Sequence, residues 1–314
     1  MNVSKFYYFK NGMRFVHNYK HEYIGHAKKR WVDQGLLDVY RKEFLSCTPQ
    51  YYESAIIDGR ITVNGQKVKT DYLIRENDKI VHAVIRKEPP VIDQTIDIIY
   101  QDKDLVAVDK PASMPVHEGG SYKHNSLLSI LENDYNLKGL KTVHRLDRQT
   151  SGIVFFAKNV KATNEFRTAL DNDQVQKIYY ARVLGNFKQT YGTDEVEVNK
   201  WVYTENFKLV LQNCADELDL TEETRKTAKT HQIRVHLKAL GHPIANDVIY
   251  GGKYRNNCIE NQFTDEDFED VYQNKTDEKD YLFLILWLHA YKYTYKDISA
   301  KTKKPCWAET DFKL

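Results

Sequence analysis

The chain is poor in the features that mark metal sites, disulfide frameworks and membrane spans. Among its 314 residues are four cysteines: Cys47, Cys214, Cys258 and Cys306. No two of them form a Cys-x-x-Cys pair, so the pattern favours free thiols in a reducing compartment over a zinc site or a disulfide framework. The longest purely apolar run, Leu282 to Leu288, is too short to cross a bilayer, and we expect it to form a buried strand. The N-terminus carries no charged and then apolar leader, so we do not expect secretion.

The composition is that of a globular protein with unevenly distributed charge. Hydrophobic residues make up 41% of the chain and charged residues 29%, which allows a sizeable packed core, and the length favours two domains. Residues 1–90 hold 16 Lys and Arg against 10 Asp and Glu, a net of +6, whereas the remainder holds 30 against 34, a net of −4. A basic front end indicates an arm for a polyanion, and ordinary surface charge stays open as the alternative.

The front of the chain carries a succession of helix and strand signals. Leu37, Tyr40 and Phe44 recur at helical spacing, and the pair Asn64-Gly65 favours a type I′ turn between two strands. The predicted elements are helices over 36–44 and 49–57, a hairpin of strands over 61–63 and 66–68, and a strand over 79–81.

Two helices followed by the run Gly59 to Gly65 (Gly-Arg-Ile-Thr-Val-Asn-Gly) resemble the S4 RNA-binding module. The resemblance implies basic side chains that contact RNA phosphates, and an ordinary small α+β domain is the alternative. The candidate side chains are Arg41, Lys42, Arg60 and Lys67. The domains expected are an N-terminal extension over 1–33, an S4-like module over 34–88 and, after a linker stiffened by Pro89 and Pro90, a second domain over 92–314.

The most informative stretch runs from 141 to 158. Its first part is polar and places Asp147 between two arginines, and its second part, residues 153–158, is an apolar run typical of a buried strand. Residues 150–152 (Thr-Ser-Gly) favour a tight turn. The pattern predicts a carboxylate on a loop at the edge of a sheet, although charge pattern alone favours a surface ion pair.

Several segments resemble motifs of the RluA-type RNA pseudouridine synthases. They are Lys110-Pro111 with Val116-His117; His144-Arg145-Leu146-Asp147 followed by Thr150-Ser151-Gly152; Lys177 to Gly185, which matches Lys-x-Tyr-x-Ala-x-Val-x-Gly; and Lys229 to Leu237. The last of these matches the family's Gly-Arg-Thr-His-Gln-Ile-Arg-Val-His-Leu, with Ala228 and Lys229 in place of glycine and arginine. A lysine at 229 turns a forked phosphate contact into a point-charge contact.

The resemblance implies an α+β fold, with the S4-like module followed by a catalytic domain that has a mixed, largely antiparallel sheet and the site in a cleft across it. It implies an isomerase that cuts uracil from C1′ of its ribose, rotates it and rejoins it through C5, without metal or cofactor. Asp147 takes the position of the catalytic carboxylate, Arg234 that of its ionic partner and Tyr179 that of the active-site tyrosine. The expected substrate-binding residues in this domain are His144, Arg145, Arg148 and Lys229.

Alternatives stay open for these residues. Arg148 is the second candidate for the partner of Asp147, Tyr179 by spacing alone is a core residue, and His144 could equally be a loop histidine bonded to backbone. The mechanism is open between attack of Asp147 on C1′ and abstraction of a ribose proton. A non-catalytic RNA-binding or RNA-chaperone protein is the competing function, and a hydrolase is disfavoured because no second acid is evident.

The expected partner is RNA. Within the family the chain is most similar to the eukaryotic branch that modifies tRNA, so we expect tRNA, in its anticodon loop, as the substrate, with rRNA and mRNA open. We expect a monomer with no membrane association and no metal, in the cytoplasm, with nucleus and mitochondrion open. Residues 260–280 hold nine acidic residues and two lysines, and we expect them to lie away from the RNA site because their charge repels RNA.

Overall fold

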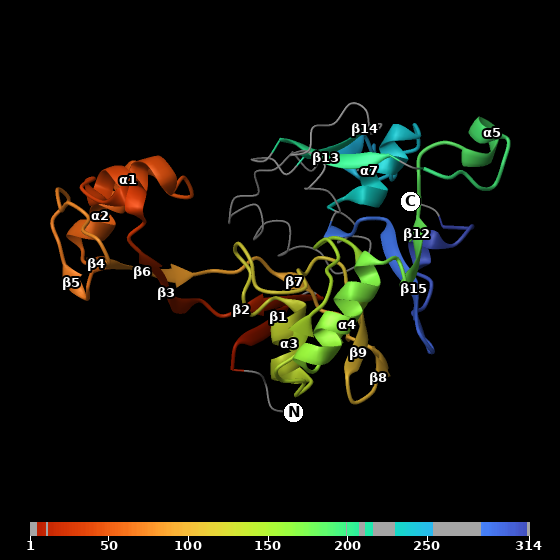
Figure 1. Ribbon diagram of the computed structural model, residues 1–314, viewed down its shortest axis with the longest axis horizontal. Helices are drawn as coiled ribbons and strands as arrows, with labels where there is room; N and C mark the ends of the chain where they lie inside the picture. The colour runs from red at the N-terminus through yellow and green to blue at the C-terminus, as the bar shows by residue number, and fades with distance from the viewer. Residues whose placement is uncertain are drawn as a thin grey trace. The chain divides into compact units, whose positions relative to one another are not determined.

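The computed structural model describes residues 5–10, 12–198, 200–206, 211–215, 230–253 and 284–312 (Figure 1). The chain divides into two compact units: a smaller unit, His17–Glu88, and a larger unit made of Met1–Val16 with Pro89–Leu314. Lys229 and the acidic segment 260–280 lie outside the described residues. Of the cysteines, Cys47 and Cys306 are free and exposed.

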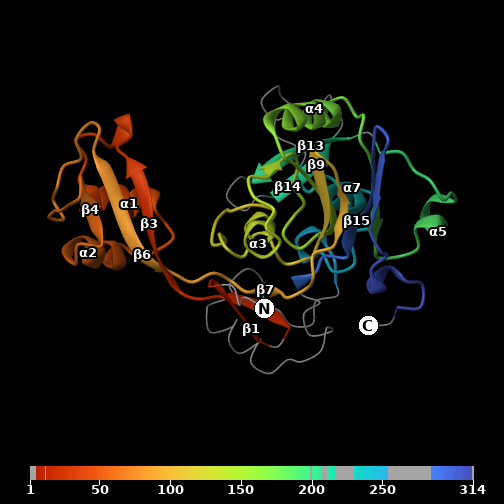
Figure 2. The same ribbon diagram turned by 90° about the horizontal axis from the view of Figure 1, so that it is seen from below.

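The smaller unit packs two helices against a four-stranded sheet with the strand order β3-β6-β4-β5. Its elements are β3 (Tyr19–His26), the 3-10 turn η1 (Lys29–Trp31), α1 (Leu36–Glu43), α2 (Pro49–Ile57), β4 (Ile61–Val63), β5 (Gln66–Lys67) and β6 (Lys79–Arg86). Figure 2 shows the long strands β3 and β6 side by side, and they pair antiparallel over eight residues each. Strand β3 was not predicted from the sequence, and it comes before the first predicted helix, which begins at residue 36.

Local chemistry explains the predicted elements of this unit. Helix α2 spans the predicted residues, because Pro49 suits its first turn and the Thr48 hydroxyl accepts a hydrogen bond from the Tyr51 N–H at 3.2 Å. The hairpin turn is also confirmed, since Asn64 and Gly65 have φ values of 51° and 76°, as a type I′ turn requires.

The larger unit is built on a seven-stranded sheet whose main path is β12-β15-β11-β9-β8, with β10 beside β11 and β16 beside β15. Its elements are β8 (Ile98–Gln101), β9 (Leu105–Lys110), α3 (Leu127–Asp134), β10 (Lys141–Thr142), β11 (Ser151–Ala157), α4 (Val160–Asp171), β12 (Gln176–Ala181), α5 (Phe187–Tyr191), β13 (Trp201–Asn206), β14 (Leu211–Ala215), α7 (Gln232–Ala239), the 3-10 turn η3 (Val248–Tyr250), β15 (Leu288–Tyr295), β16 (Ile298–Lys301) and the 3-10 turn η5 (Cys306–Ala308). A separate three-stranded sheet joins β1 (Tyr7–Lys10), β2 (Met13–Val16) and β7 (Val91–Ile92). Only β11 and β15 pair in parallel, so the described sheet is mixed and largely antiparallel, as predicted.

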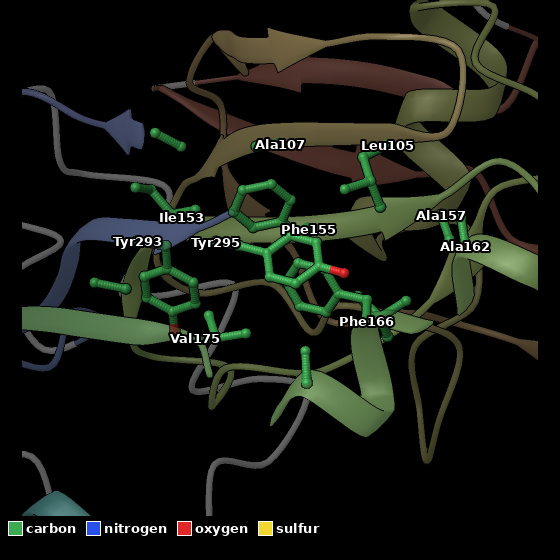
Figure 3. Packing of buried hydrophobic residues seen from close by; sticks show 14 residues of the cluster. Leu105, Ala107, Ile153, Phe155, Ala157, Ala162, Phe166, Val175, Tyr293 and Tyr295 are labelled. Carbon is green, nitrogen blue, oxygen red and sulfur yellow. The ribbon is translucent and has the colours of Figure 1, made fainter. Parts of the chain in front are cut away.

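Strand β11 is the centre of the core of the larger unit. Every residue from Gly152 to Ala157 is buried. Figure 3 shows Ile153 and Phe155 on the face of the sheet that α4 covers, and the Phe155 and Phe166 rings lie 5.1 Å apart. Burial of each side chain of this size contributes about 1.5–3 kcal/mol to the free energy of folding. Strand β11 therefore firmly anchors the loop before it, residues 143–150, which we name the Asp147 loop.

The structure differs from the tight turn predicted over residues 150–152, and Gly152 shows why. It lies inside β11, which begins at Ser151, so the glycine does not serve a tight turn. Its φ is +110°, and a Cβ at this position would lie 2.3 Å from the Ala290 carbonyl oxygen. A glycine is therefore needed because β15 approaches β11 closely here.

The apolar run 282–288 also differs from prediction, which made it a buried strand. Strand β15 begins only at Leu288, and of the preceding residues the structure describes Leu284 to Trp287, which are outside any strand. The Leu286 N–H donates to the Gln149 carbonyl at 2.9 Å, so this segment supports the Asp147 loop.

Candidate active site

A cavity of about 720 Å³ opens in the larger unit around the loop that carries Asp147. It is lined by that loop, by the N-terminal part of α7 and by side chains of β12 and β15, among them Asp147, Tyr179, His231, Arg234 and Tyr293. Its volume is in the range of small-molecule and cofactor sites and leaves room for one nucleoside.

One row across the sheet brings the elements of the cavity together. Tyr179 of β12 is paired with Ala290 of β15, Ala290 with Gly152 of β11, and Gly152 with Lys110 of β9. The register of β12 shifts between Ile178 and Tyr179, and such a bulge re-aims the side chain that follows it. The Asp147 loop therefore lies at one end of β11, close to Tyr179.

Three consecutive carbonyls hold the Asp147 loop in place. The carbonyl of Asp147 accepts from the Thr150 N–H at 3.1 Å, that of Arg148 from Lys110 Nζ at 3.2 Å, and that of Gln149 from the Leu286 N–H at 2.9 Å. These donors come from the loop itself, from β9 and from the segment before β15. A loop fixed from three sides presents its side chains with little reorganisation.

Lys110 is fully buried and acts as a clamp behind this loop. Its Nζ also donates to the carbonyls of Pro111 and Met114, each at 2.9 Å. Burial lowers the pKa of the Lys110 ammonium to about 7, although the negative charge of Asp147 opposes the shift. The sequence segment around Lys110 was matched to the family without a role for this side chain.

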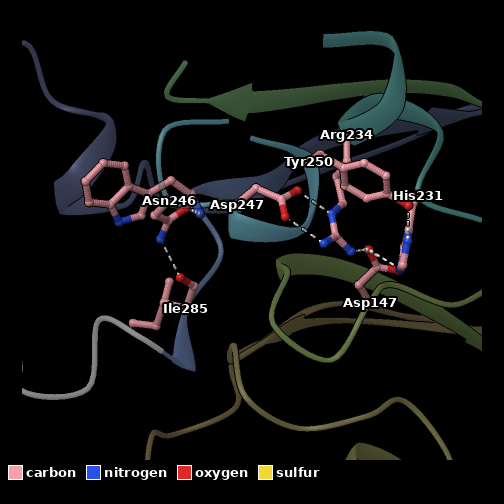
Figure 4. Close-up of polar contacts among 8 residues, drawn as sticks. Asp147, His231, Arg234, Asn246, Asp247, Tyr250 and Ile285 are labelled. Carbon is pink, nitrogen blue, oxygen red and sulfur yellow. Dashed lines mark hydrogen bonds and ion pairs between the residues drawn. The ribbon is translucent and has the colours of Figure 1, made fainter. Parts of the chain in front are cut away.

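Arg234 lies between two carboxylates (Figure 4). Its Nη1 lies 3.1 Å from Asp147 Oδ2, while its Nε and Nη2 bind Asp247 Oδ2 and Oδ1 at 2.6 and 2.9 Å. Arg234 and Asp247 are each only 3% exposed. Burial alone would lower the pKa of the guanidinium, but the hydrogen bonds and charges of Asp247 and then Asp147 raise it above its ordinary value. Arg234 is therefore a permanent cation, fixed by Asp247 and aimed at Asp147.

His231 is the other described neighbour of the Asp147 carboxylate. Its Nε2 lies 3.6 Å from Oδ2, the same oxygen that Arg234 contacts, and its Nδ1 lies 2.9 Å from the Tyr250 hydroxyl. His231 precedes α7 with a left-handed φ of 57°, which is uncommon for a residue with a side chain and clusters at functional sites. Burial lowers the pKa of its imidazole.

Tyr179 and Tyr293 line the cavity together. Their hydroxyl groups are hydrogen-bonded to each other, and their ring centroids lie 6.0 Å apart. Burial raises the pKa of both phenols, so both keep their protons at neutral pH. The pair presents an aromatic surface beside Asp147.

His144 is bonded to backbone, the alternative that the sequence left open. Its Nε2 accepts a hydrogen bond from the Phe155 N–H at 3.0 Å, so this nitrogen carries no proton. Burial lowers the pKa of the imidazole to about 4. His144 thus joins the Asp147 loop to β11 as a neutral ring.

Comparison with known proteins identifies the family. A family model of RNA pseudouridylate synthases matches residues 104–239. RNA pseudouridine synthase 7 of Oryza sativa subsp. japonica is 36% identical over 266 residues, which cover 78% of this chain and 67% of the relative. The human pseudouridylate synthase RPUSD2 is 36% identical, with 78% of this chain and 47% of the relative covered. The mitochondrial tRNA pseudouridine(32) synthase of Saccharomyces cerevisiae is 35% identical, with 76% and 55% covered.

The chain belongs to the RNA pseudouridine synthase family. The matched segment of the enzyme includes Asp147, Tyr179 and Arg234, whereas Asp247 and Tyr250 lie beyond it. The structure adds four residues around Asp147 that were not proposed as site residues from the sequence: Asp247, Lys110, His231 and Tyr293. Asp247 lies in the run 246–250 (Asn-Asp-Val-Ile-Tyr), which could have drawn attention to it from the sequence. However, no spacing rule connects this aspartate to Arg234.

The other predicted substrate-binding residues of the enzyme are placed as follows. Arg145 lines the cavity with an exposed side chain, while the half-buried Arg148 has its Cζ 5.9 Å from the centre of the Tyr122 ring. The described partner of Asp147 is thus Arg234 and not Arg148. Lys229 lies outside the described residues.

The four basic candidates of the smaller unit differ in their partners. Arg41 lies 3.5 Å from Glu53 and 3.9 Å from Asp38, and Arg60 lies 3.2 Å from Asp58. Lys42 and Lys67 have no ion-pair partner among the described residues. Within the same residues, no cluster of His, Cys, Asp and Glu could hold a metal ion, and no helix is long and apolar enough to cross a membrane.

Proposed function

We propose that the enzyme converts uridine to pseudouridine in tRNA, with Asp147 as the catalytic carboxylate. The observation that carries the proposal is the position of Asp147 in the cavity, 3.1 Å from the buried cation of Arg234. A fixed cation beside a carboxylate is the preorganised electrostatic arrangement that this chemistry requires.

The reaction balances without a co-reactant. The C1′–N1 bond breaks, a C1′–C5 bond forms, the proton on C5 is lost and N1 gains a proton. The two described contacts of the Asp147 carboxylate, from Arg234 and His231, both reach Oδ2. We assign Oδ1 to the substrate, where it either attacks C1′ or takes a proton from the ribose.

Tyr179 and Tyr293 suit the base. A uridine in a stacked loop must flip out to reach Asp147, and flipping costs a few kcal/mol. Packing of the uracil on the Tyr179 ring offsets part of that cost. Because burial raises the pKa of the Tyr179 phenol, we assign this residue to contact with the uracil and not to action as a free phenolate.

We assign the RNA-binding role of an S4-like module to residues 34–88 and the chemistry to residues 92–314. In the smaller unit Arg41, Lys42, Arg60 and Lys67 would bind phosphates, which gives affinity without sequence choice. Arg145 and Arg148 would serve the same purpose near the cavity, and we assign the same role to Lys229, which lies outside the described residues. The choice of tRNA rests on the similarity to the yeast tRNA pseudouridine(32) synthase, which is mitochondrial. We propose an anticodon-loop uridine in a cytoplasmic tRNA, with mitochondrial tRNA as the alternative.

The test is tritium release from RNA labelled at uridine C5, with the purified protein and its Asp147→Asn variant on bulk tRNA and on rRNA. We expect release from tRNA that vanishes in the variant. Release from rRNA alone would keep the activity and discard the substrate. Tight RNA binding without release from either RNA would instead favour the non-catalytic RNA-binding protein.

A further inference from the structure

A continuous row of aromatic and basic side chains runs from the middle of the paired strands β3 and β6 to helix α2 in the smaller unit. The ring of Tyr23 on β3 lies 6.5 Å from that of His82 on β6, and His82 Nε2 lies 3.1 Å from the Tyr51 hydroxyl on α2. The Cζ of Arg60 lies over the Tyr51 ring at 4.8 Å. We name Tyr23, His82, Tyr51 and Arg60 the aromatic row.

The row runs outward from beneath the helices, because the rings of Tyr40 on α1 and Tyr52 on α2 pack against His82, which is only 9% exposed. Ile80 and His82 share one face of β6, because they are two residues apart, and Ile80 belongs to the core beneath α1 and α2. Tyr23 is directly opposite His82 on β3 and is 48% exposed. Tyr23 therefore leaves one exposed aromatic ring at the edge of a helix-covered face, with further rings behind it.

The neighbours of Tyr23 fix the orientation of its ring. His21 packs edge-on against it at 4.6 Å, and the Cζ of Arg86 lies 5.9 Å from its centre. A ring held in one orientation loses little conformational entropy when a flat ligand stacks on it. Burial, together with the charge of Arg60, lowers the pKa of His82, so His82 is an uncharged ring at neutral pH.

We propose that the aromatic row binds unpaired nucleobases of the RNA substrate, with a base stacked on Tyr23 and the neighbouring phosphate near Arg60. Stacking on aromatic side chains beside a cation is how proteins hold single-stranded RNA. The net positive charge of the front of the chain favours RNA over an acidic or apolar partner. The inference rests on the proposed function and adds a second contact for the RNA, on residues that the predicted phosphate contacts, apart from Arg60, do not use.

The test is substitution of Tyr23 in the full chain. Tyr23→Ala and Tyr23→Leu remove the ring, Tyr23→Phe retains it, and Ile24→Ala is the matched control, since Ile24 is the next residue on the opposite face and is 56% exposed. We would measure the Kd for a tRNA and for an oligouridylate across a range of salt, together with the melting temperature of each variant.

Loss of one stacked base corresponds to about a 5- to 150-fold weaker Kd. We expect this for Tyr23→Ala and Tyr23→Leu, with Tyr23→Phe and Ile24→Ala close to wild type. The slope of log Kd against log salt should stay unchanged in the Tyr23 variants and decrease in magnitude by about 0.7 in Arg60→Gln, because only a phosphate contact releases counterions.

Two outcomes would overturn the inference: Kd values within twofold of wild type for Tyr23→Ala and Tyr23→Leu, or equal losses for those variants and Ile24→Ala. Tritium release by the wild-type protein, measured on the same preparation, separates this failure from that of the proposed function. Release with unchanged binding in the Tyr23 variants would discard the aromatic row alone, whereas absent release would discard the activity.

Discussion

Arginine side chains lie in two different environments in the two units. In the larger unit, the Arg234 side chain is 4% exposed and lies between two carboxylates at 2.6 to 3.1 Å. In the smaller unit, the Arg41 side chain is 44% exposed, and its acidic neighbours are exposed as well. A buried, fixed charge creates a field at one point, whereas an exposed charge attracts a polyanion and is screened by salt. The same residue type is therefore expected to control rate in one unit and affinity in the other.

The sharpest test of this contrast is removal of the arginine from each unit. Arg234→Leu should abolish measurable tritium release, a loss of at least about 10³-fold, and should lower the free energy of unfolding by about 3–5 kcal/mol, because Asp247 is left buried without a cation. Arg41→Leu, at an exposed pair, should change stability by less than about 0.5 kcal/mol. Urea unfolding and single-turnover tritium release measure both effects.

The double variant Arg234→Leu with Asp247→Leu separates stability from chemistry. It replaces the buried ion pair by apolar side chains, so we expect much of the lost stability to return while activity stays absent. Recovery of activity in the double variant would show that the Arg234 cation is not needed, and the contrast between the units would fail.

A milder change removes the charge of one carboxylate partner in each unit: Asp247 beside Arg234, and Asp58 beside Arg60. Asp247→Asn keeps the shape but removes the charge that orients Arg234, so we expect kcat to fall by about 10- to 100-fold with KM changed less than threefold. Asp58→Asn, the equivalent change beside Arg60, should leave kcat unchanged. If Asp247→Asn raised KM at constant kcat, Asp247 would serve binding and not the orientation of Arg234.

Many helices and strands could be predicted from local sequence signals, whereas the candidate active site depends on contacts between residues far apart in the sequence. The cap at Thr48, the Asn64-Gly65 turn and the apolar run of β11 are readable because each depends on neighbours in sequence. Asp147 and Arg234 are 87 residues apart, and only the family resemblance paired them. The clamp of Lys110 on the Arg148 carbonyl has no local signature, because it depends on how β9 and β11 pair.

Gly152 and strand β3 show two further limits. The glycine was explained by a turn because turns are the common use of glycine, whereas its reason is the approach of the Ala290 backbone from a strand 138 residues away. The residues of β3 were not assigned, since their mixture of aromatic and polar side chains has no clean alternation. Pairing with β6 decides their structure, and this pairing also creates the aromatic row.

We expect the larger unit to lose stability at acid pH because it holds two buried, neutral histidines beside β11, His144 and His289. Burial lowers the pKa of His144 and of His289 to about 4, from about 6.5 in the unfolded chain. The unfolded state then binds protons that the folded state does not, so the stability is fully present above pH 6.5 and is lost as the pH falls from about 6.5 towards 4. Between pH 7.5 and 5, each histidine should cost about 2 kcal/mol.

The urea midpoint, followed by tryptophan fluorescence at several pH values, measures this loss. His289 lies between the Ser151 hydroxyl at 2.8 Å and the Thr302 hydroxyl at 2.7 Å, and His289→Gln removes its titration. We expect this variant to be less stable at pH 7.5 but to have a flatter pH profile. An equally steep profile in His289→Gln would exclude His289 as a source of acid sensitivity.

The smallest effect is expected for an exposed lysine of the smaller unit. Lys67, in the hairpin strand β5, has no ion-pair partner among the described residues, whereas Arg41 has Glu53 and Asp38 close by. A phosphate that binds Lys67 does not compete with a carboxylate, so Lys67→Gln should weaken RNA binding more than Arg41→Gln. We expect a loss of affinity of about two- to fivefold for Lys67→Gln, with the slope of log Kd against log salt reduced in magnitude by about 0.7 to 0.9.

The kcat of Lys67→Gln at saturating RNA should stay unchanged, because an exposed charge at this position adds affinity and creates no field at the reacting atoms. A fall in kcat for Lys67→Gln would show that the smaller unit acts on the chemical step, and it would remove the distinction between the two kinds of basic residue.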